Sequence, residues 1–285
     1  MRSPALRSHA PPATKAHKRA AGDLLSRVAV AIVGLPLVLG IVWLGGWWLF
    51  ALALVAGLIG LHEFVVVTRT LRPIAVAGYA GLVCILIGIE LGGLAWGIGG
   101  LFVALALAFV LKGLGDTRGS STVSVGTTVI GVAWIGFGLG YVLLLRDIPH
   151  DGRLAALTVL IAVFAADTAA YVVGRVFGRH KLAPRLSPGK TWEGFVVGSA
   201  AAVLAVWIAL YKTGFLPTGR SLVLGAAIAL AAPAGDLFES ALKREMQVKD
   251  TGRLLGGHGG VLDRIDSLLF ASIAAFYVIL AFAAA

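Results

Sequence analysis

The chain has few charged side chains and almost no cysteine, and these two shortages restrict what it can be. Only 13% of its 285 residues are charged and 59% are hydrophobic, whereas soluble domains carry about 25% charged residues. This composition excludes a soluble globular protein and indicates an integral membrane protein. The single cysteine, Cys84, lies in an apolar run, so a disulfide framework is excluded and a buried thiol is favoured over a nucleophile.

Acidic residues are also scarce, at 14 against 24 Lys and Arg, which leaves a net charge of +10. In a soluble protein this charge would suggest nucleic acid, but in a membrane protein the positive-inside rule explains it better. We therefore expect no nucleic-acid partner. Residues 1–22 are rich in Pro, Ala, Ser and basic side chains and are predicted to form a disordered basic cytoplasmic tail. The tail either contacts anionic lipid headgroups or only fixes the orientation of the protein.

Long apolar runs are what the chain has in abundance. A membrane-spanning helix needs roughly 20 apolar residues. Nine segments come close to that length, at residues 28–45, 47–66, 74–92, 95–111, 123–145, 154–174, 194–211, 221–240 and 266–284. The predicted fold class is therefore an all-α polytopic membrane protein with about nine transmembrane helices.

The basic residues assign the loops to the two sides of the membrane. With the N-terminus in the cytoplasm, 20 of the 24 basic residues fall on cytoplasmic segments. The four on the other side are Arg146, Arg153, Lys212 and Arg220. This asymmetry predicts a cytoplasmic N-terminus and an outside C-terminus, with both long polar loops in the cytoplasm.

The first polar region begins inside an apolar run. Asp167, Tyr171 and Arg175 are spaced so that they share one helix face. A carboxylate within a span is costly and usually faces a bundle interior or a polar cavity. The alternative for Asp167 is a structural ion pair with Arg175.

Residues 174–194 then combine five basic side chains with hydroxyls and a Pro-Gly turn. Positive-inside bias explains the bases, but not their combination with Ser187, Lys190 and Thr191, which suits phosphate oxygens. The stretch "SPGKT" lacks the G-x-x-x-x-G-K frame and a preceding strand, so we reject a P-loop.

The second polar region begins near the end of the eighth apolar run. Asp236, Glu239, Ser240 and Lys243 are spaced to form one polar stripe on a helix. Further charged residues, one histidine and a run of glycines follow, namely Lys249, Asp250, Gly256, Gly257, His258, Gly259, Gly260, Asp263, Arg264 and Asp266.

The glycines in this second region permit close backbone approach, and successive N–H groups in such a turn can cradle an anion. Aspartates beside a phosphate cradle suggest Mg²⁺, which prefers oxygen ligands and keeps substrate phosphates in its shell. Simpler interpretations exist for each part alone. The glycines could form a tight turn, His258 could be a hydrogen-bonding partner, and Asp266 could cap the ninth helix.

Residues 240–266, "SALKREMQVKDTGRLLGGHGGVLDRID", resemble the defining motif of phosphatidate cytidylyltransferases, the CDP-diacylglycerol synthases. Residues 167–194 and "GDLFES" at 235–240 resemble two further conserved regions of that family. One departure is Gly256, where the family often has Pro. The resemblance is close from residue 167 onward and extends to the rest only as a pattern of apolar spans.

The resemblance implies a nucleotidyltransferase of phospholipid biosynthesis that joins CTP and phosphatidic acid into CDP-diacylglycerol and pyrophosphate. It implies Mg²⁺ on Asp236 and Asp263, with room for a second cation. The implied catalytic residues are Asp236, Asp263, Lys249, Asp250, Arg264 and Asp266. The implied substrate-binding residues are Asp167, Tyr171, Arg175, Ser187, Lys190, Thr191, Ser240, Lys243, Arg244, His258, Gly259 and Gly260.

The same resemblance divides the chain. Residues 23–150 would form N-terminal transmembrane helices, and residues 151–285 a catalytic transmembrane region with cytoplasmic loops 175–193 and 241–265. The expected partners are CTP, phosphatidic acid and membrane lipids, with a homodimer as an open alternative. The expected location is the inner (plasma) membrane, with many spans and cytoplasmic active-site loops.

Other classes of membrane protein fit less well. CDP-alcohol phosphotransferases share a D-G start with "DGRLA" at 151–155, but the rest of that motif is missing and the segment faces outside. The N-D-x-x-D pairs of prenyltransferases are absent from the sequence. A transporter would use intramembrane carboxylates as ion sites, and inverted repeats would support it, but none is visible.

Overall fold

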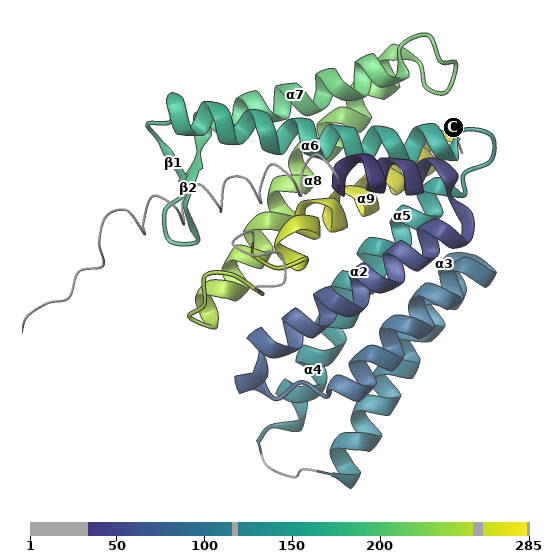
Figure 1. Ribbon diagram of the computed structural model, residues 1–285, viewed down its shortest axis with the longest axis vertical. Coiled ribbons are helices and arrows are strands. Elements are labelled where there is room, and N and C mark those ends of the chain that lie inside the picture. Colours follow the sequence, from purple (N-terminus) through teal and green to yellow (C-terminus); the bar gives the residue numbers. More distant parts are fainter. Residues whose placement is uncertain (1–33, 116–118, 253–258, 284–285) are drawn as a thin grey trace, which may run out of the picture.

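The computed structural model describes residues 34–115, 119–252 and 259–283, and most of these are helical (Figure 1). The predicted tail at residues 1–22 lies outside the described residues, as do Gly256, Gly257 and His258. The long apolar runs fold as helices because a membrane offers no water to bond backbone N–H and C=O groups, and a helix satisfies them internally.

The elements follow the apolar runs in order. A short apolar helix, Gly34–Leu44, is followed by α2 (Gly46–Val67), the turn η1 (Arg69–Leu71), α3 (Ala75–Leu114), α4 (Ser121–Val132), the π-helical turn η2 (Ala133–Phe137), α5 (Gly138–Arg146), α6 (Gly152–Val176), β1 (Lys181–Ala183), β2 (Ser187–Thr191), α7 (Trp192–Leu210), α8 (Thr218–Glu245) and α9 (Leu262–Ala283). Within the described residues, seven continuous helical segments are long and apolar enough to cross a membrane. The all-α polytopic class is therefore confirmed.

The segment α3 combines two of the predicted spans. Its helical backbone is broken at Gly93, which has φ 71° and ψ −162°. The halves on either side fold back on each other. They pack so closely that a Cβ on Gly88 would collide with the backbone of Trp96, and one on Gly100 with the backbone of Ile85. Only glycine adopts this backbone conformation readily, so Gly93 makes the reversal possible.

The helices form two groups that share a core. In the N-terminal half α3 packs on α4 and on α2, and in the C-terminal half α6 packs on α7 and α8 on α9 (Figure 1). The helix α9 also packs on α5, so it joins the halves. Small residues allow close contact between helices, as where Gly194 and Gly198 of α7 meet the backbone of α6 at Ala170 and Ala166.

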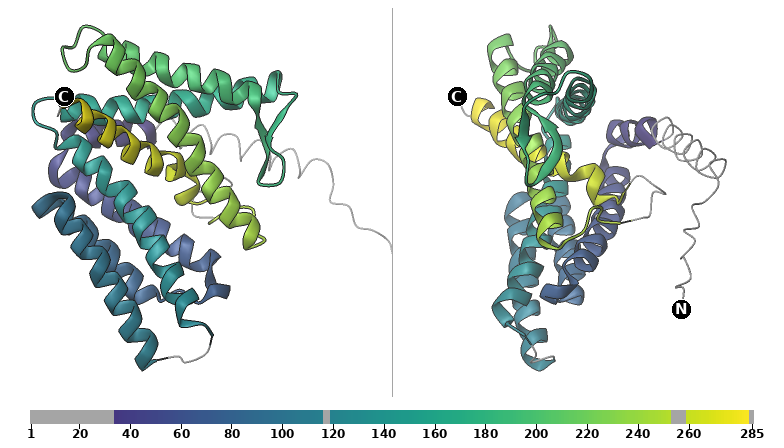
Figure 2. Two further views of the ribbon diagram at one scale, coloured as in Figure 1. Left: turned by 180° about the vertical axis from the view of Figure 1, so that it is seen from behind. Right: turned by 90° about the vertical axis from the view of Figure 1, so that its left-hand side faces the viewer.

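Two boundaries differ from the prediction and change the setting of the site. Helix α8 continues to Glu245, past the predicted end at residue 240, and α9 begins at Leu262, ahead of the predicted start at 266. Residues 181–191 of the first predicted loop form an antiparallel β-hairpin, β1–β2, which is visible at the side of the helices in Figure 2. Most of the candidate site residues therefore stand on regular elements.

Candidate active site

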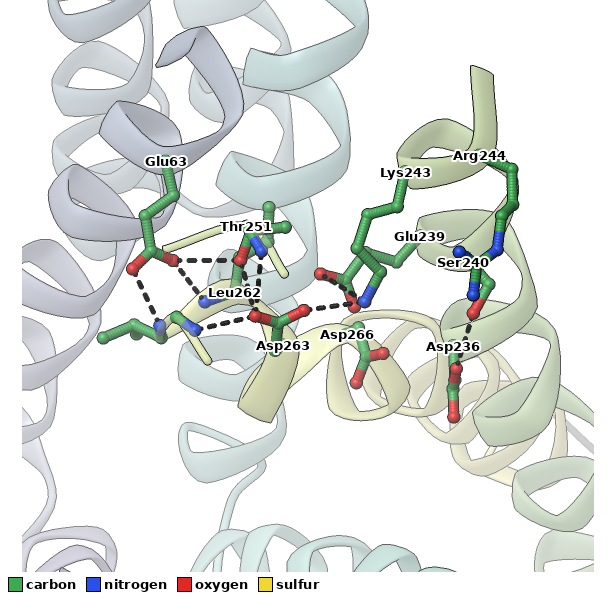
Figure 3. A network of polar contacts seen from close by, with 12 residues as sticks. Glu63, Asp236, Glu239, Ser240, Lys243, Arg244, Thr251, Leu262, Asp263 and Asp266 are labelled. Atoms are coloured by element: carbon green, nitrogen blue, oxygen red, sulfur yellow. Dashed lines mark hydrogen bonds and ion pairs between the residues drawn. The ribbon is translucent and has the colours of Figure 1, made fainter. Parts of the chain in front are cut away.

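The end of α8 carries the polar stripe that its spacing predicts. Ser240 Oγ donates a hydrogen bond to Asp236 Oδ1 at 3.2 Å, and Lys243 Nζ lies 3.5 Å from Glu239 Oε1 (Figure 3). Glu239 is fully buried, and its carboxyl group lies against both Lys243 and Asp266. The stripe thus presents two carboxylates and one ammonium group to the neighbouring helix.

The beginning of α9 completes this cluster. Gly235 of α8 lies directly against the backbone of Asp266, where any side chain larger than hydrogen would collide with the Asp266 carbonyl. This contact sets the two helix ends side by side, and Lys243 Nζ pairs with Asp263 Oδ1 at 2.7 Å (Figure 3). Asp266 is a buried residue in the second turn of α9 and does not precede the helix, so the alternative that it is the N-cap is wrong.

The β-hairpin brings the first polar region to the same place. Lys190 Nζ of β2 pairs with Asp236 Oδ2 at 2.7 Å, and Arg244 Nε of α8 donates to the carbonyl of Leu186 at 3.0 Å. Ser187 opens β2, and Thr191 is the N-cap of α7, where its hydroxyl accepts from Gly194 N at 3.2 Å. Two regions far apart in sequence therefore meet at one polar cluster.

Helix α6 borders the cluster with Asp167. This side chain is exposed in the isolated chain although it lies within a span, and it interacts with Ser267 and lies near Asp236 and Asp266. Arg175 Nη1 instead donates to the Tyr171 hydroxyl at 2.7 Å. The described contacts thus favour the polar-cavity interpretation of Asp167 over an ion pair with Arg175.

The cluster contains more carboxyl groups than ammonium groups. Five carboxylates share it with two lysines, and the members are Asp167, Asp236, Glu239, Asp263, Asp266, Lys190 and Lys243. Among the described residues, no three acidic, His or Cys side chains converge as a preformed cation cage. Mg²⁺ prefers oxygen ligands and is usually held by one or two carboxylates together with water and substrate phosphates, so the carboxyl groups of the cluster fit that ion.

The remaining predicted residues lie at the edge of this cluster. Lys249, Asp250 and Arg264 are exposed, and they flank the segment 253–258 that the structure does not describe. Gly259 has a positive φ of 78°, and Gly260 N donates to Asp263 Oδ2 at 2.7 Å. The predicted anion cradle of the glycine-rich loop stays a prediction, because most of it lies outside the described residues.

Two residues of the site are absent from the sequence prediction. Glu63 of α2 and Thr251 are both buried and lie beside the ends of the glycine-rich segment, residues 252–260. Glu63 accepts a hydrogen bond from Leu262 N, and Thr251 donates one to Asp263 (Figure 3). A signal for Glu63 was available, because an ionisable side chain within an apolar span is by default a functional candidate. Thr251 offered no signal beyond its place beside Lys249 and Asp250.

An apolar cavity of about 110 Å³ lies elsewhere, between the short N-terminal helix, α2, α5, α6 and α9. Its lining side chains are all hydrocarbon and include Leu49, Leu139 and Leu268. Such a cavity has no group that could stabilise phosphate charge.

Comparisons with known proteins show the family of this chain. Residues 25–282 match the Cytidylyltransferase family. A phosphatidate cytidylyltransferase of Mycobacterium bovis is 32% identical over 291 aligned positions, covering 94% of this chain and 92% of the relative. Proteins of the same name from Staphylococcus haemolyticus and Brucella suis are each 34% identical, covering 86% and 88% of this chain and 94% and 91% of the relatives. The chain therefore belongs to the cytidylyltransferase family.

Proposed function

We propose that this protein transfers the cytidylyl group of CTP to phosphatidic acid, giving CDP-diacylglycerol and pyrophosphate in phospholipid biosynthesis. The observation that carries the proposal is the meeting of two separate polar regions through the Lys190–Asp236 pair and the Arg244–Leu186 contact. Lysine, arginine and carboxylate groups gathered at the end of two spans suit a reaction between a soluble nucleotide and a lipid phosphate. The names of the relatives support the same substrates.

In the proposed reaction a phosphate oxygen of phosphatidic acid attacks the α-phosphorus of CTP. A new P–O bond joins the two phosphates, the bond between the α-phosphorus and the bridging oxygen breaks, and pyrophosphate leaves. Positioning and charge neutralisation dominate such transfers. Lys249 and Arg264 are exposed beside the cluster and would bind the nucleotide phosphates, while Lys190 and Lys243 would hold the carboxylates in place.

We further propose Asp236 and Asp263 as the residues that would hold Mg²⁺, with a second cation as an extension. When bound, the ion supplies positive charge to the phosphate oxygens as negative charge shifts to the leaving group. The excess of carboxyl groups over ammonium groups in the cluster supports this proposal, because Mg²⁺ prefers oxygen ligands. Asp167 and Asp266 add to the same excess.

The proposed topology has nine spans, a cytoplasmic N-terminus and an outside C-terminus, in the inner membrane. Supporting this, the broken segment α3 supplies two antiparallel halves, and the short helix Gly34–Leu44 precedes α2. In Figure 1 the hairpin β1–β2 and the end of α8 lie on the side opposite the C-terminus.

The test is a labelled-substrate assay. Detergent-purified protein is incubated with phosphatidic acid, Mg²⁺ and CTP that carries its label on either the α- or the γ-phosphate. We expect α-label in an extractable lipid and γ-label only in pyrophosphate, with no labelled lipid when phosphatidic acid is omitted. Lipid carrying γ-label would indicate a kinase instead, and solute flux into liposomes without CTP consumption would indicate a transporter.

A further inference from the structure

Glu63 is a buried carboxylate that reaches the catalytic region from the other half of the chain. It lies in α2, is 5% exposed, and is separated by almost 200 positions from the residues it binds. Its Oε1 accepts from Val261 N at 3.0 Å and its Oε2 accepts from Leu262 N at 2.8 Å (Figure 3). These two N–H groups belong to the start of α9.

The pairing of the Glu63 carboxylate with the N–H groups at the start of α9 has a clear physical basis. The first N–H groups of a helix have no partner within the helix, and the helix dipole favours negative charge at that end. A buried carboxylate is costly unless it is well hydrogen-bonded. Glu63 and the start of α9 therefore satisfy each other, and each carboxylate oxygen has its own backbone donor.

The packing around the Glu63 carboxylate is tight. A Cβ on Gly252 or on Gly260 would collide with the Glu63 carboxylate. Gly252 is the last described residue before residues 253–258, and Gly260 is the second described residue after them. Glu63 is thus enclosed by both ends of the glycine-rich segment.

Asp263 holds the same two ends from the other side. Its Oδ2 accepts from Thr251 N at 3.1 Å, from Thr251 Oγ1 at 2.9 Å and from Gly260 N at 2.7 Å. Thr251 Oγ1 also lies 3.5 Å from Glu63 Oε2, which places the hydroxyl between the two carboxylates. The orientation of Asp263 therefore depends on backbone that Glu63 fixes.

We infer that Glu63 is a positioning residue for the reaction: it anchors the start of α9 and both ends of the glycine-rich segment to α2. It thereby holds Asp263 in the orientation that the polar cluster requires. Glu63 touches none of the reacting groups itself and acts through Asp263. This inference rests on the proposed function for its kinetic part, but its structural part stands on the contacts alone.

The decisive variant is Glu63→Gln, which keeps the size of the side chain. The amide oxygen of Gln still accepts one of the two backbone hydrogen bonds. The NH₂ group faces the other backbone N–H and cannot accept a hydrogen bond from it. We expect kcat for CDP-diacylglycerol formation to fall about tenfold or more, with the KM values for CTP and phosphatidic acid within about threefold. Amide hydrogen exchange at residues 259–263 should become faster.

The matched control is Glu90→Gln, which makes the same chemical change in the span segment α3, away from the polar cluster. We expect its kcat and its amide exchange at 259–263 to equal those of the unmodified protein. Glu63→Asp is the second variant, because its shorter side chain keeps the charge but withdraws from the start of α9. It should fold and show an intermediate loss of kcat.

The outcomes separate the possibilities. Normal kcat per folded molecule in both Glu63 variants, or unchanged exchange at 259–263, would overturn the inference. If Glu63→Gln fails to fold, the kcat and exchange of Glu63→Asp decide. If the unmodified protein makes no CDP-diacylglycerol, the proposed function fails, while faster exchange in Glu63→Gln would still support the anchoring role.

Discussion

At the scale of single residues, the two proposed metal-binding carboxylates have different surroundings. Asp263 uses Oδ1 for Lys243 and Oδ2 for three donors from Thr251 and Gly260. Asp236 binds only Lys190 and Ser240 among the described residues, and it is partly exposed. Asp263 therefore has a structural role in addition to its proposed ligand role, whereas Asp236 makes fewer contacts with the described residues.

This difference leads to a prediction for the two amide variants. Asp236→Asn and Asp263→Asn should each nearly abolish activity. Asp263→Asn should also lower the free energy of unfolding by about 2–4 kcal/mol, because an NH₂ group would face N–H donors and Lys243 would lose its buried partner. Asp236→Asn should cost about 1 kcal/mol or less, because it loses only a partly exposed pair. Thermal unfolding in detergent and the labelled-CTP assay measure both quantities.

Equal stability losses for the two variants would contradict this distinction. Near-normal turnover of Asp263→Asn, or an active protein after EDTA treatment, would remove the metal assignment. In a protein that depends on the ion, EDTA should stop the reaction and added Mg²⁺ should restore it.

Lys249 offers a cleaner test of phosphate binding, because its side chain is exposed. Lys249→Ala should lower kcat/KM for CTP by about tenfold or more, since a charge-assisted contact is worth roughly 1.5–3 kcal/mol. Its thermal midpoint should not change.

The control for Lys249 has to be chosen from the structure. Arg146, a basic residue predicted on the opposite side, donates to the carbonyls of Val42, Trp43 and Leu44 and so caps the short N-terminal helix. Its replacement would disturb the fold. Lys212, which contacts only the ring of Tyr211 among the described residues, is the better control. Equal losses for Lys249→Ala and Lys212→Ala would mean that the charges serve membrane insertion.

At the scale of elements, the sequence predicts the helices well and the connections less well. Apolar length alone locates α2, α6 and α7 to within a few residues, because the membrane sets the length of a span. The ends of α8 and α9 depend instead on tertiary partners. Lys243 is held by Asp263, and the start of α9 is held by Glu63, and no local pattern contains these contacts. The hairpin β1–β2 was missed for the same reason, since its anchors Lys190 and Leu186 bind α8.

The reversal at Gly93 gives a prediction for an element. Gly93→Ala should lower the free energy of unfolding by about 1–3 kcal/mol, because φ 71° with ψ −162° is open almost only to glycine. Gly99→Ala, in the following helix with nothing within 4 Å of the added Cβ, should be neutral or slightly stabilising. Thermal unfolding of the two variants makes the comparison, and equal midpoints would contradict the proposed turn.

At the scale of the whole molecule, the two halves meet where the chemistry is proposed. The sequence resemblance begins at Asp167 and assigns no role to the N-terminal half, yet Glu63 from that half binds the start of α9. The C-terminal motif was therefore enough to predict the family, but not which residues hold the motif in shape. Contacts between residues so far apart in sequence leave no trace in local spacing or composition.

The orientation of the whole molecule gives the last prediction. CTP is a cytoplasmic nucleotide, so the hairpin and the end of α8 must face the cytoplasm for the proposed reaction to occur. Single cysteines replacing Arg185 in the hairpin or Glu245 at the end of α8, in a Cys84→Ala background, should be shielded from membrane-impermeant thiol reagents in intact cells. A cysteine replacing Thr218, at the exposed start of α8, should be labelled. All three should react after the membrane is permeabilised, which shows that each site is accessible. Labelling of position 185 or 245 in intact cells would reverse the orientation and remove access of CTP to the polar cluster.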